Sequence, residues 1–159
     1  MAKSESTGGQ SVSTGQVRLE RIYLKDSSFE SPRSPGVFAE AWKPEMQLEV
    51  NARSNTLENN RYEVVLTVTL RAKGESGKTA FIIEVQQAGL FVIEGIEDDV
   101  LQRVLATVCP NTLFPYVRES VDSMAVRGGF PAIQLAPMNF DAAYADAVKK
   151  KSPAEDVTH

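Results

Sequence analysis

The feature that most constrains the fold of this 159-residue chain is a ten-residue run, Tyr62–Arg71, in which apolar and mostly polar positions alternate. Every second residue from Tyr62 to Leu70 is apolar or aromatic, and Val65 is the one apolar residue of the other set. A period of two places such side chains on one face of a β-strand. The run therefore predicts a strand with one face against a core.

Three further segments have the character of strands. Met46–Asn51 alternates in the same way, Val17–Asp26 is rich in β-formers with mixed faces, and Thr79–Ile93 is apolar on both faces except at a few positions. Gly74 and Gly77 predict a turn between Arg71 and Thr79, so the two long strands should form a hairpin. We expect a four-stranded, mostly antiparallel sheet.

The second half of the chain has helical periodicity. Three helices are expected: Val100–Val108, which begins after acidic residues and is stopped by Pro110; about Asn111–Arg127, which ends at Gly128–Gly129; and a third from near Asn139 into Lys149–Lys151. Strands followed by helices indicate an α+β domain. Helices can cover one face of so apolar a sheet. We expect a second molecule to cover the other face, especially along Phe81–Val85, so that the protein is an oligomer.

The composition of the chain divides it into three parts. Residues 1–16 are rich in Ser, Thr, Gly and Gln and should form a disordered extension, residues 17–148 a folded domain, and residues 149–159 a flexible tail. The N-terminus lacks the apolar core of a signal peptide, and no stretch approaches the roughly 18 apolar residues of a membrane span. With a single cysteine, a reducing compartment is expected, and the protein should be cytoplasmic.

Charge and residue counts exclude several classes of function. A net charge of −4, from 21 acidic and 17 basic residues, is unfavourable for nucleic-acid binding. Cys109 and His159 are the only residues of their types, so a zinc site of the usual kind cannot be completed. Carboxylates are plentiful, but no spacing selects a catalytic pair. We expect no enzyme activity, no cofactor and no metal.

The segment Ala72–Thr79 resembles a relaxed phosphate-binding loop, with Lys78 in the lysine position. Such a loop must lie between a strand and a helix, because the helix N-terminus supplies the amides that bind phosphate. Here the residues that follow are expected to form a strand. The segment is therefore interpreted as a hairpin turn with a solvated lysine.

Two surface features remain open on the residues alone. Asp26, Glu30, Glu63 and Glu84 lie in or beside the expected strands. They form either a solvated face, which their charge pattern favours, or a docking surface for a basic partner. The segment Phe29–Pro44 is held extended by its prolines and carries three aromatic residues. It either packs its aromatics into the core or forms an aromatic-walled binding groove.

Several strings of the sequence, in order, resemble the SecB family of bacterial protein-export chaperones. They are Arg21–Pro32, Tyr62–Leu66, Ala80–Gly89, Cys109–Glu119, Arg127–Pro131 and Leu135–Asp141. The resemblance covers about Val17–Val148. It implies an α+β subunit that assembles as a dimer of dimers, a homotetramer. It also implies an ATP-independent chaperone that binds unfolded precursor proteins and passes them to the SecA ATPase, without inserting into the membrane.

The resemblance also implies roles for individual positions. Matched to the family, the SecA-binding surface comprises Asp26, Glu30, Ile82 and Glu84; the client-binding groove comprises Tyr23, Phe38, Trp42, Met46, Leu48 and Phe140; and Ile83, Val85 and Gln87 match positions associated with subunit contact. An alternative is a SecB-like chaperone dedicated to one toxin–antitoxin system.

Overall fold

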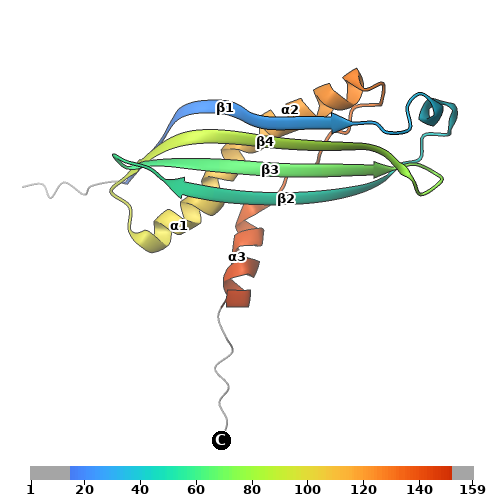
Figure 1. Ribbon diagram of the computed structural model, residues 1–159. Helices are drawn as coiled ribbons and strands as arrows, with labels where there is room; N and C mark the ends of the chain where they lie inside the picture. Colours follow the sequence, from blue (N-terminus) through green and yellow to red (C-terminus); the bar gives the residue numbers. More distant parts are fainter. Residues whose placement is uncertain (1–14, 152–159) are drawn as a thin grey trace, which may run out of the picture.

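A computed structural model of the chain describes residues 15–151 (Figure 1). Four strands come first, and the helices follow. The strands are β1 (Gln16–Glu30), β2 (Glu45–Thr56), β3 (Arg61–Lys73) and β4 (Thr79–Glu94); the α-helices are α1 (Asp98–Ala106), α2 (Val108–Arg127) and α3 (Phe140–Lys151). A short 3-10 helix, η1 (Gly36–Ala39), lies between β1 and β2. The predicted α+β class and four-stranded sheet are confirmed. The expected N-terminal extension and C-terminal tail lie largely outside the described residues.

The sheet has the strand order β1-β4-β3-β2, and every pairing in it is antiparallel. β2 and β3 are joined at Asn59 and Asn60, whose φ angles of 58° and 59° are left-handed, a conformation that asparagine tolerates. The expected hairpin joins β3 to β4, with Gly77 at φ 75°. Because β1 pairs with β4 and not with β2, β1 and β2 are the two edges of the sheet.

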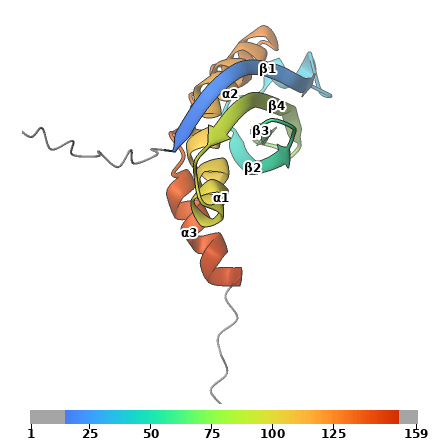
Figure 2. The same cartoon turned by 90° about the vertical axis from the view of Figure 1, so that its left-hand side faces the viewer.

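α1 and α2 lie on one face of the sheet, which we call the helix side, and α3 extends away from the sheet (Figure 2). α2 packs on β4 and β3, and the alternating residues of Tyr62–Arg71 divide as predicted, with Val64, Leu66, Val68 and Leu70 in the core. The mixed faces of β1 have a physical cause. Its register shifts between Leu19 and Arg21 and again between Leu24 and Asp26, and each shift changes which residues face the core.

The other side of the sheet, which we call the open face, differs from the sequence-based expectation. Phe81, Ile83 and Val85 were expected to need a second molecule as their cover, and this was wrong, because they are fully buried in the core on the helix side. Their neighbours Ile82 and Glu84 point to the open face instead. β4 alternates its faces like any strand, and apolar residues on both sides obscure that period in the sequence.

The ends of α2 fix the chain that follows it. Pro110 was expected to separate the first two helices, and this was wrong. It lies in the first turn of α2, where its missing N–H needs no partner. At the other end, Gly129 has φ 90°, its N–H donates to the carbonyl of Val126, and the N–H of Phe130 donates to that of Ala125. This is a Schellman motif, which turns Phe130 back toward the sheet. No helix within residues 15–151 is long and apolar enough to cross a bilayer.

Candidate functional site

Five aromatic side chains gather where the loop after β1 meets the end of α2. We call them the aromatic cluster: Phe29, Phe38, Trp42, Phe81 and Phe130. Phe130 is the hub, with ring centroids 4.8 Å from Phe81, 5.1 Å from Trp42 and 5.3 Å from Phe38. Phe130 is 5% exposed, whereas Phe38 is 51% exposed. The cluster is therefore anchored in the core and open to solvent on one side.

A pocket opens beside the exposed part of the aromatic cluster. Its volume is about 180 Å³, and it is lined by Val37, Phe38, Glu40, Trp42, Gly129, Phe130 and Pro131. A Cβ at Gly129 would lie 3.0 Å from the Phe38 ring, so glycine is needed here for close packing as well as for its positive φ. Because a cavity of about 150 Å³ accepts benzene, this aromatic pocket has room for one apolar side chain.

An apolar strip continues from the aromatic pocket along the helix side of β2. Met46 and Leu48 are 38% and 43% exposed, and Val50 and Ala52 follow on the same face. The strip ends at a second hollow of about 330 Å³, lined by Val50, Asn51, Ala52, Ala106, Met138, Phe140, Ala143, Tyr144 and Ala147. At about 3.3 Å per residue, Met46 to Ala52 spans about 20 Å. The β2 strip thus connects the two hollows.

The structure brings most of the expected groove residues together. Phe38 and Trp42 line the aromatic pocket, Met46 and Leu48 form the β2 strip, and Phe140, although only 8% exposed, lines the second hollow. Tyr23 is not among them. It lies on the open face, where its hydroxyl donates to the carboxylate of Glu63.

Sequence reasoning missed the three residues that α2's C-terminal turn contributes to the aromatic pocket, Gly129, Phe130 and Pro131. The double glycine was interpreted only as a helix end. A Phe–Pro pair directly after it could have indicated that the turn delivers an aromatic ring to the core.

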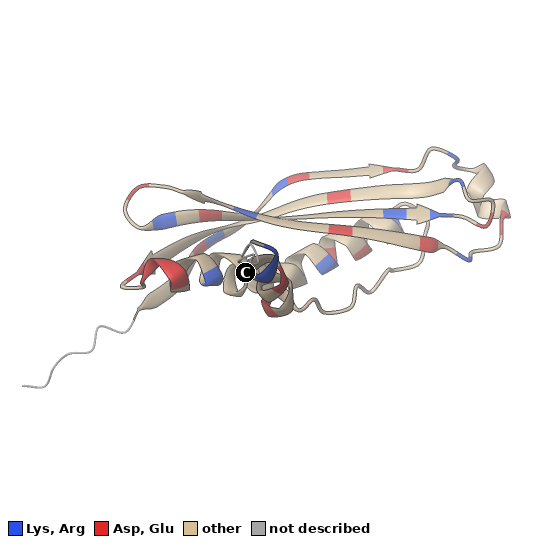
Figure 3. Ribbon diagram, turned by 90° about the horizontal axis from the view of Figure 1, so that it is seen from below, with Lys and Arg blue, Asp and Glu red and all other residues tan. Residues whose placement is uncertain are grey.

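The four residues matched to SecA binding lie together on the open face, and we call them the acidic patch: Asp26, Glu30, Ile82 and Glu84. In the β1–β4 register, Glu30 pairs with Ile82, Ser28 with Glu84 and Asp26 with Gln86, which places the patch on two neighbouring strands. Figure 3 shows acidic positions on several neighbouring strands in the right-hand half of the sheet. Glu49 continues the same row, because Thr69 pairs with both Glu49 and Glu84. Sequence reasoning did not include Glu49.

Ion pairing separates these acids from the others on the sheet. Glu20 pairs with Arg61 at 2.8 Å and Glu63 with Lys25 at 2.8 Å. Among the described residues, no basic side chain comes within 4 Å of the carboxylates of Asp26, Glu30 or Glu84. Within the described residues these three carboxylates therefore make no close ion pair, and Arg71 lies in the same row of the open face as Glu30 and Ile82.

Glu63, by contrast, has a structural role that predicts an acid-dependent loss of stability. Hydrogen bonds from Lys25 and then Tyr23 hold the pKa of Glu63 below its ordinary value, while burial and the bond to Glu63 raise the pKa of Tyr23 to about 12. Since the pKa of Glu63 is lower in the folded chain, its contribution is complete above about pH 5 and is lost as the pH falls through the folded-state value. Glu63→Gln should lower the free energy of unfolding by about 1–2 kcal/mol at pH 7.

Urea unfolding of the wild type and Glu63→Gln at pH 7 and pH 3.5 checks this prediction. The difference between the two proteins should shrink at pH 3.5. Glu49→Gln, an exposed acid on the same face, is the control and should have little effect at either pH. A difference that is equally large at both pH values would contradict the assigned role of the Glu63 carboxylate.

The three positions matched to subunit contact lie inside the subunit. Ile83 and Val85 are 0% exposed and Gln87 is 4% exposed, all on the helix side. Their side chains contribute to the subunit's own core, so a role in assembly stays a prediction. In contrast to these three buried residues, α2 carries exposed apolar side chains: Val108, Tyr116 and Val126 are each about half exposed.

Cys109, the one cysteine of the sequence, is not placed to act as a nucleophile. Cys109 is fully buried, and burial raises the pKa of its thiol to about 12, so the thiolate is not available at neutral pH. Within residues 15–151 there is no group of three His, Cys, Asp or Glu side chains placed to hold a metal ion. Lys78 follows a hairpin turn and precedes β4, as the interpretation of that segment as a turn requires.

Two hollows joined by an exposed apolar strip are typical of proteins that bind apolar segments of other polypeptides. The comparisons with known proteins agree with this class. The family model for SecB, described as preprotein translocase subunit SecB, matches residues 10–151. The chain therefore belongs to the SecB family of protein-export chaperones.

Individual relatives give the same result. The chain is 52% identical to protein-export protein SecB of Hahella chejuensis over 89% of this chain and 91% of that one. It is 43% identical to protein-export protein SecB of Pseudomonas aeruginosa, over 99% and 96% of the two chains. Among solved structures, a SecB-like chaperone of Mycobacterium tuberculosis, in complex with a ChAD peptide from an antitoxin, superposes with a TM-score of 0.64 at 20% identity, over 77% of this chain and 91% of that chain. This last likeness shows the shared fold.

Proposed function

We propose that this protein binds unfolded precursor polypeptides in the cytoplasm, keeps them competent for translocation without ATP, and delivers them to SecA. The observation that carries this proposal is the exposed apolar path from the aromatic pocket along the β2 strip. Folded clients bury their apolar segments and unfolded ones expose them, so such a surface selects the unfolded state. The match to export chaperones at 43–52% identity supports it.

The dimensions of the surface suggest how a client lies on it. The β2 strip spans about 20 Å, the length of about six residues of extended chain. The aromatic pocket accepts one apolar side chain, and the second hollow provides a further subsite. Neither subsite demands a particular sequence, because their linings are mostly apolar and aromatic. Weak subsites of this kind add up along one client.

We propose further that the acidic patch docks SecA and that the protein works as a homotetramer, a dimer of dimers. The carboxylates of Asp26, Glu30 and Glu84 make no ion pair within the described residues, and this supports the first proposal, since they would attract a basic partner surface. The exposed apolar side chains of Val108, Tyr116 and Val126 on α2 support the second, since an oligomer would cover them.

A SecB-like chaperone dedicated to one toxin–antitoxin system is the weaker candidate. The SecB-like chaperone with the antitoxin peptide is only 20% identical to this chain, whereas relatives at 43–52% identity are named for protein export. Client breadth distinguishes the two candidates, because an export chaperone binds many unfolded chains.

Light scattering with and without a permanently unfolded polypeptide tests the proposed function. Using reduced and carboxymethylated lactalbumin, we expect the mass of a tetramer alone and a stable complex in the mixture. Phe38→Ala should leave the mass of the free protein unchanged and weaken binding on the order of tenfold, because half of the ring is exposed at the proposed client surface. A monomer that ignores the unfolded polypeptide would refute the proposal.

A further inference from the structure

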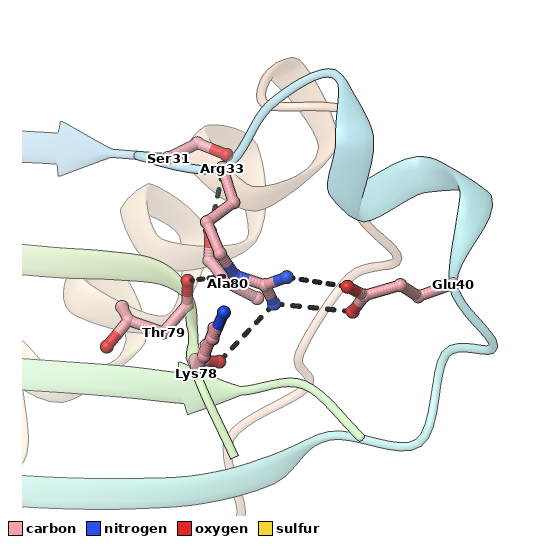
Figure 4. Close-up of polar contacts among 6 residues, drawn as sticks. All are labelled: Ser31, Arg33, Glu40, Lys78, Thr79 and Ala80. Carbon is pink, nitrogen blue, oxygen red and sulfur yellow. Dashed lines mark hydrogen bonds and ion pairs between the residues drawn. The ribbon is translucent and has the colours of Figure 1, made fainter. Parts of the chain in front are cut away.

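The loop that carries the exposed aromatics is fastened to the β3–β4 turn by one arginine (Figure 4). The Arg33 guanidinium bonds both carboxylate oxygens of Glu40, through Nη1 at 2.6 Å and Nη2 at 3.3 Å. The same side chain donates from Nε to the carbonyl of Thr79 at 3.2 Å and from Nη2 to that of Lys78 at 3.4 Å. One side chain therefore joins both arms of the loop to the sheet.

The Arg33–Glu40 ion pair bears on the aromatic pocket because of where Glu40 lies in the loop. Glu40 lies two residues after Phe38 and two before Trp42, and it lines the aromatic pocket with them. Trp42 packs on the core rings of Phe81 and Phe130. Phe38 packs against Phe130, and about half of the Phe38 side chain is exposed. Glu40 lies between these two aromatic residues in the sequence, so holding its carboxylate on Arg33 restrains the loop backbone that carries both rings.

The space beside Gly74 and the partial burial of both side chains favour the Arg33–Glu40 pair. A Cβ at Gly74 would lie 3.0 Å from Arg33 Nη2 and 3.1 Å from Glu40 Oε2, so the absence of a side chain there makes room for the pair. The Arg33 side chain is 23% exposed and that of Glu40 is 32% exposed. The hydrogen bond from Arg33 is the main cause that lowers the pKa of Glu40, so the pair stays charged at neutral pH.

We propose that Arg33 is a positioning residue for client binding: through Glu40 and the carbonyls of the β3–β4 turn it holds Phe38 and Trp42 as the walls of the aromatic pocket. This inference rests on the proposed function, because it concerns the same pocket. Without the pair, the rings keep their anchor on Phe130, but the loop backbone between them is free to move, and the pocket loses its preformed shape. Arg33 need not touch a client for this effect.

The chain contains a single tryptophan, so Trp42 fluorescence reports on the loop directly, with no client present. In Arg33→Gln and in Glu40→Gln, we expect a red-shifted emission maximum and about a twofold rise in acrylamide quenching as the indole gains solvent. Gly74→Ala should act in the same direction, because it crowds the pair without removing either charge. The double variant Arg33→Gln/Glu40→Gln should change the emission no more than one single variant does.

Binding of reduced and carboxymethylated lactalbumin gives the second readout. Arg33→Gln should weaken binding about fivefold, the effect of losing a partly exposed pair. Gly36→Ala is a matched control and should bind as the wild type does, whereas Lys78→Gln, which removes only a coulombic contribution to Glu40, should weaken binding less than Arg33→Gln does. The Lys78 carbonyl, not its amine, accepts from Arg33, and a Cβ at Gly36 meets nothing within 4 Å.

The two proposals fail in different ways. If the wild type binds no unfolded polypeptide, the proposed function is refuted. The positioning role of Arg33 in client binding is then refuted too, whatever the Trp42 fluorescence shows. A wild type that binds, beside an Arg33→Gln variant with equal affinity and an unchanged Trp42 spectrum, refutes the positioning role alone. Equal weakening by Lys78→Gln would show a general charge effect and would also overturn it.

Discussion

Replacing Phe130 by alanine is expected to lower the free energy of unfolding by about 3–5 kcal/mol, the usual effect of removing a buried phenylalanine. The ring is 5% exposed and contacts four other aromatic rings. Its removal leaves a cavity between the sheet and the loop after β1, into which neighbouring rings cannot fully relax. Urea unfolding measures the loss.

Phe38→Ala is the matched control for Phe130→Ala. Both changes remove a phenylalanine from the aromatic cluster, but Phe38 is half exposed and should contribute less than about 1 kcal/mol to stability. The two variants should therefore separate the two roles of the cluster, with Phe130 supporting the fold and Phe38 the client surface. Equal destabilisation by both would contradict the assignment of Phe130 as the hub.

The sheet could be predicted from the sequence wherever one period dominates. Tyr62–Arg71 alternates cleanly and lies within β3 as expected, and the glycines near residue 77 form the hairpin turn. The sequence did not predict which side chains of β1 point to which face of the sheet, because two register shifts interrupt the alternation along this strand. For that reason the sequence could not place Tyr23, which lies on the open face opposite the aromatic pocket.

Helix boundaries show a different limit. Pro110 lies in the first turn of α2, where no backbone N–H is needed, and α2 also continues through Pro115 in its interior, so proline alone does not mark the end of a helix here. The break between α1 and α2 is at Thr107, whose φ and ψ of −125° and −65° are not helical. No propensity rule selects that residue, because packing against the sheet decides where the chain bends.

The candidate site was predictable in its residue types but not in its construction. The aromatic residues of Phe29–Pro44 predicted either core packing or a groove. In the structure Phe29 packs, partly buried, against the core and Phe38 is half exposed, and the groove stays a prediction. Arg33 and Glu40 lie seven residues apart in an irregular loop, so no periodicity pairs them. Their bond depends on the loop folding over the β3–β4 turn, a long-range contact that local sequence does not specify.

Reversing two charges of the acidic patch, Glu30→Lys with Glu84→Lys, should weaken SecA binding at least tenfold at about 50 mM salt. The double variant changes the net charge of the patch by about four units. Attraction between exposed groups is on the order of 1 kcal/mol per close pair, and a factor of ten needs about 1.4 kcal/mol. Because exposed charges are screened, the difference from the wild type should shrink at about 500 mM salt. Calorimetric titration with purified SecA at both salt concentrations measures it.

The specificity of that effect depends on where the charge is changed. Glu58→Lys makes the same kind of reversal in the β2–β3 turn, at the opposite end of the sheet from Glu30, and should leave SecA affinity within about twofold of the wild type. All variants should bind reduced and carboxymethylated lactalbumin equally, because the acidic patch and the aromatic pocket lie on opposite faces of the sheet. Unchanged SecA affinity in the double variant at low salt would place the docking surface elsewhere. Equal loss in Glu58→Lys would reduce the acidic patch to a contribution of net charge alone.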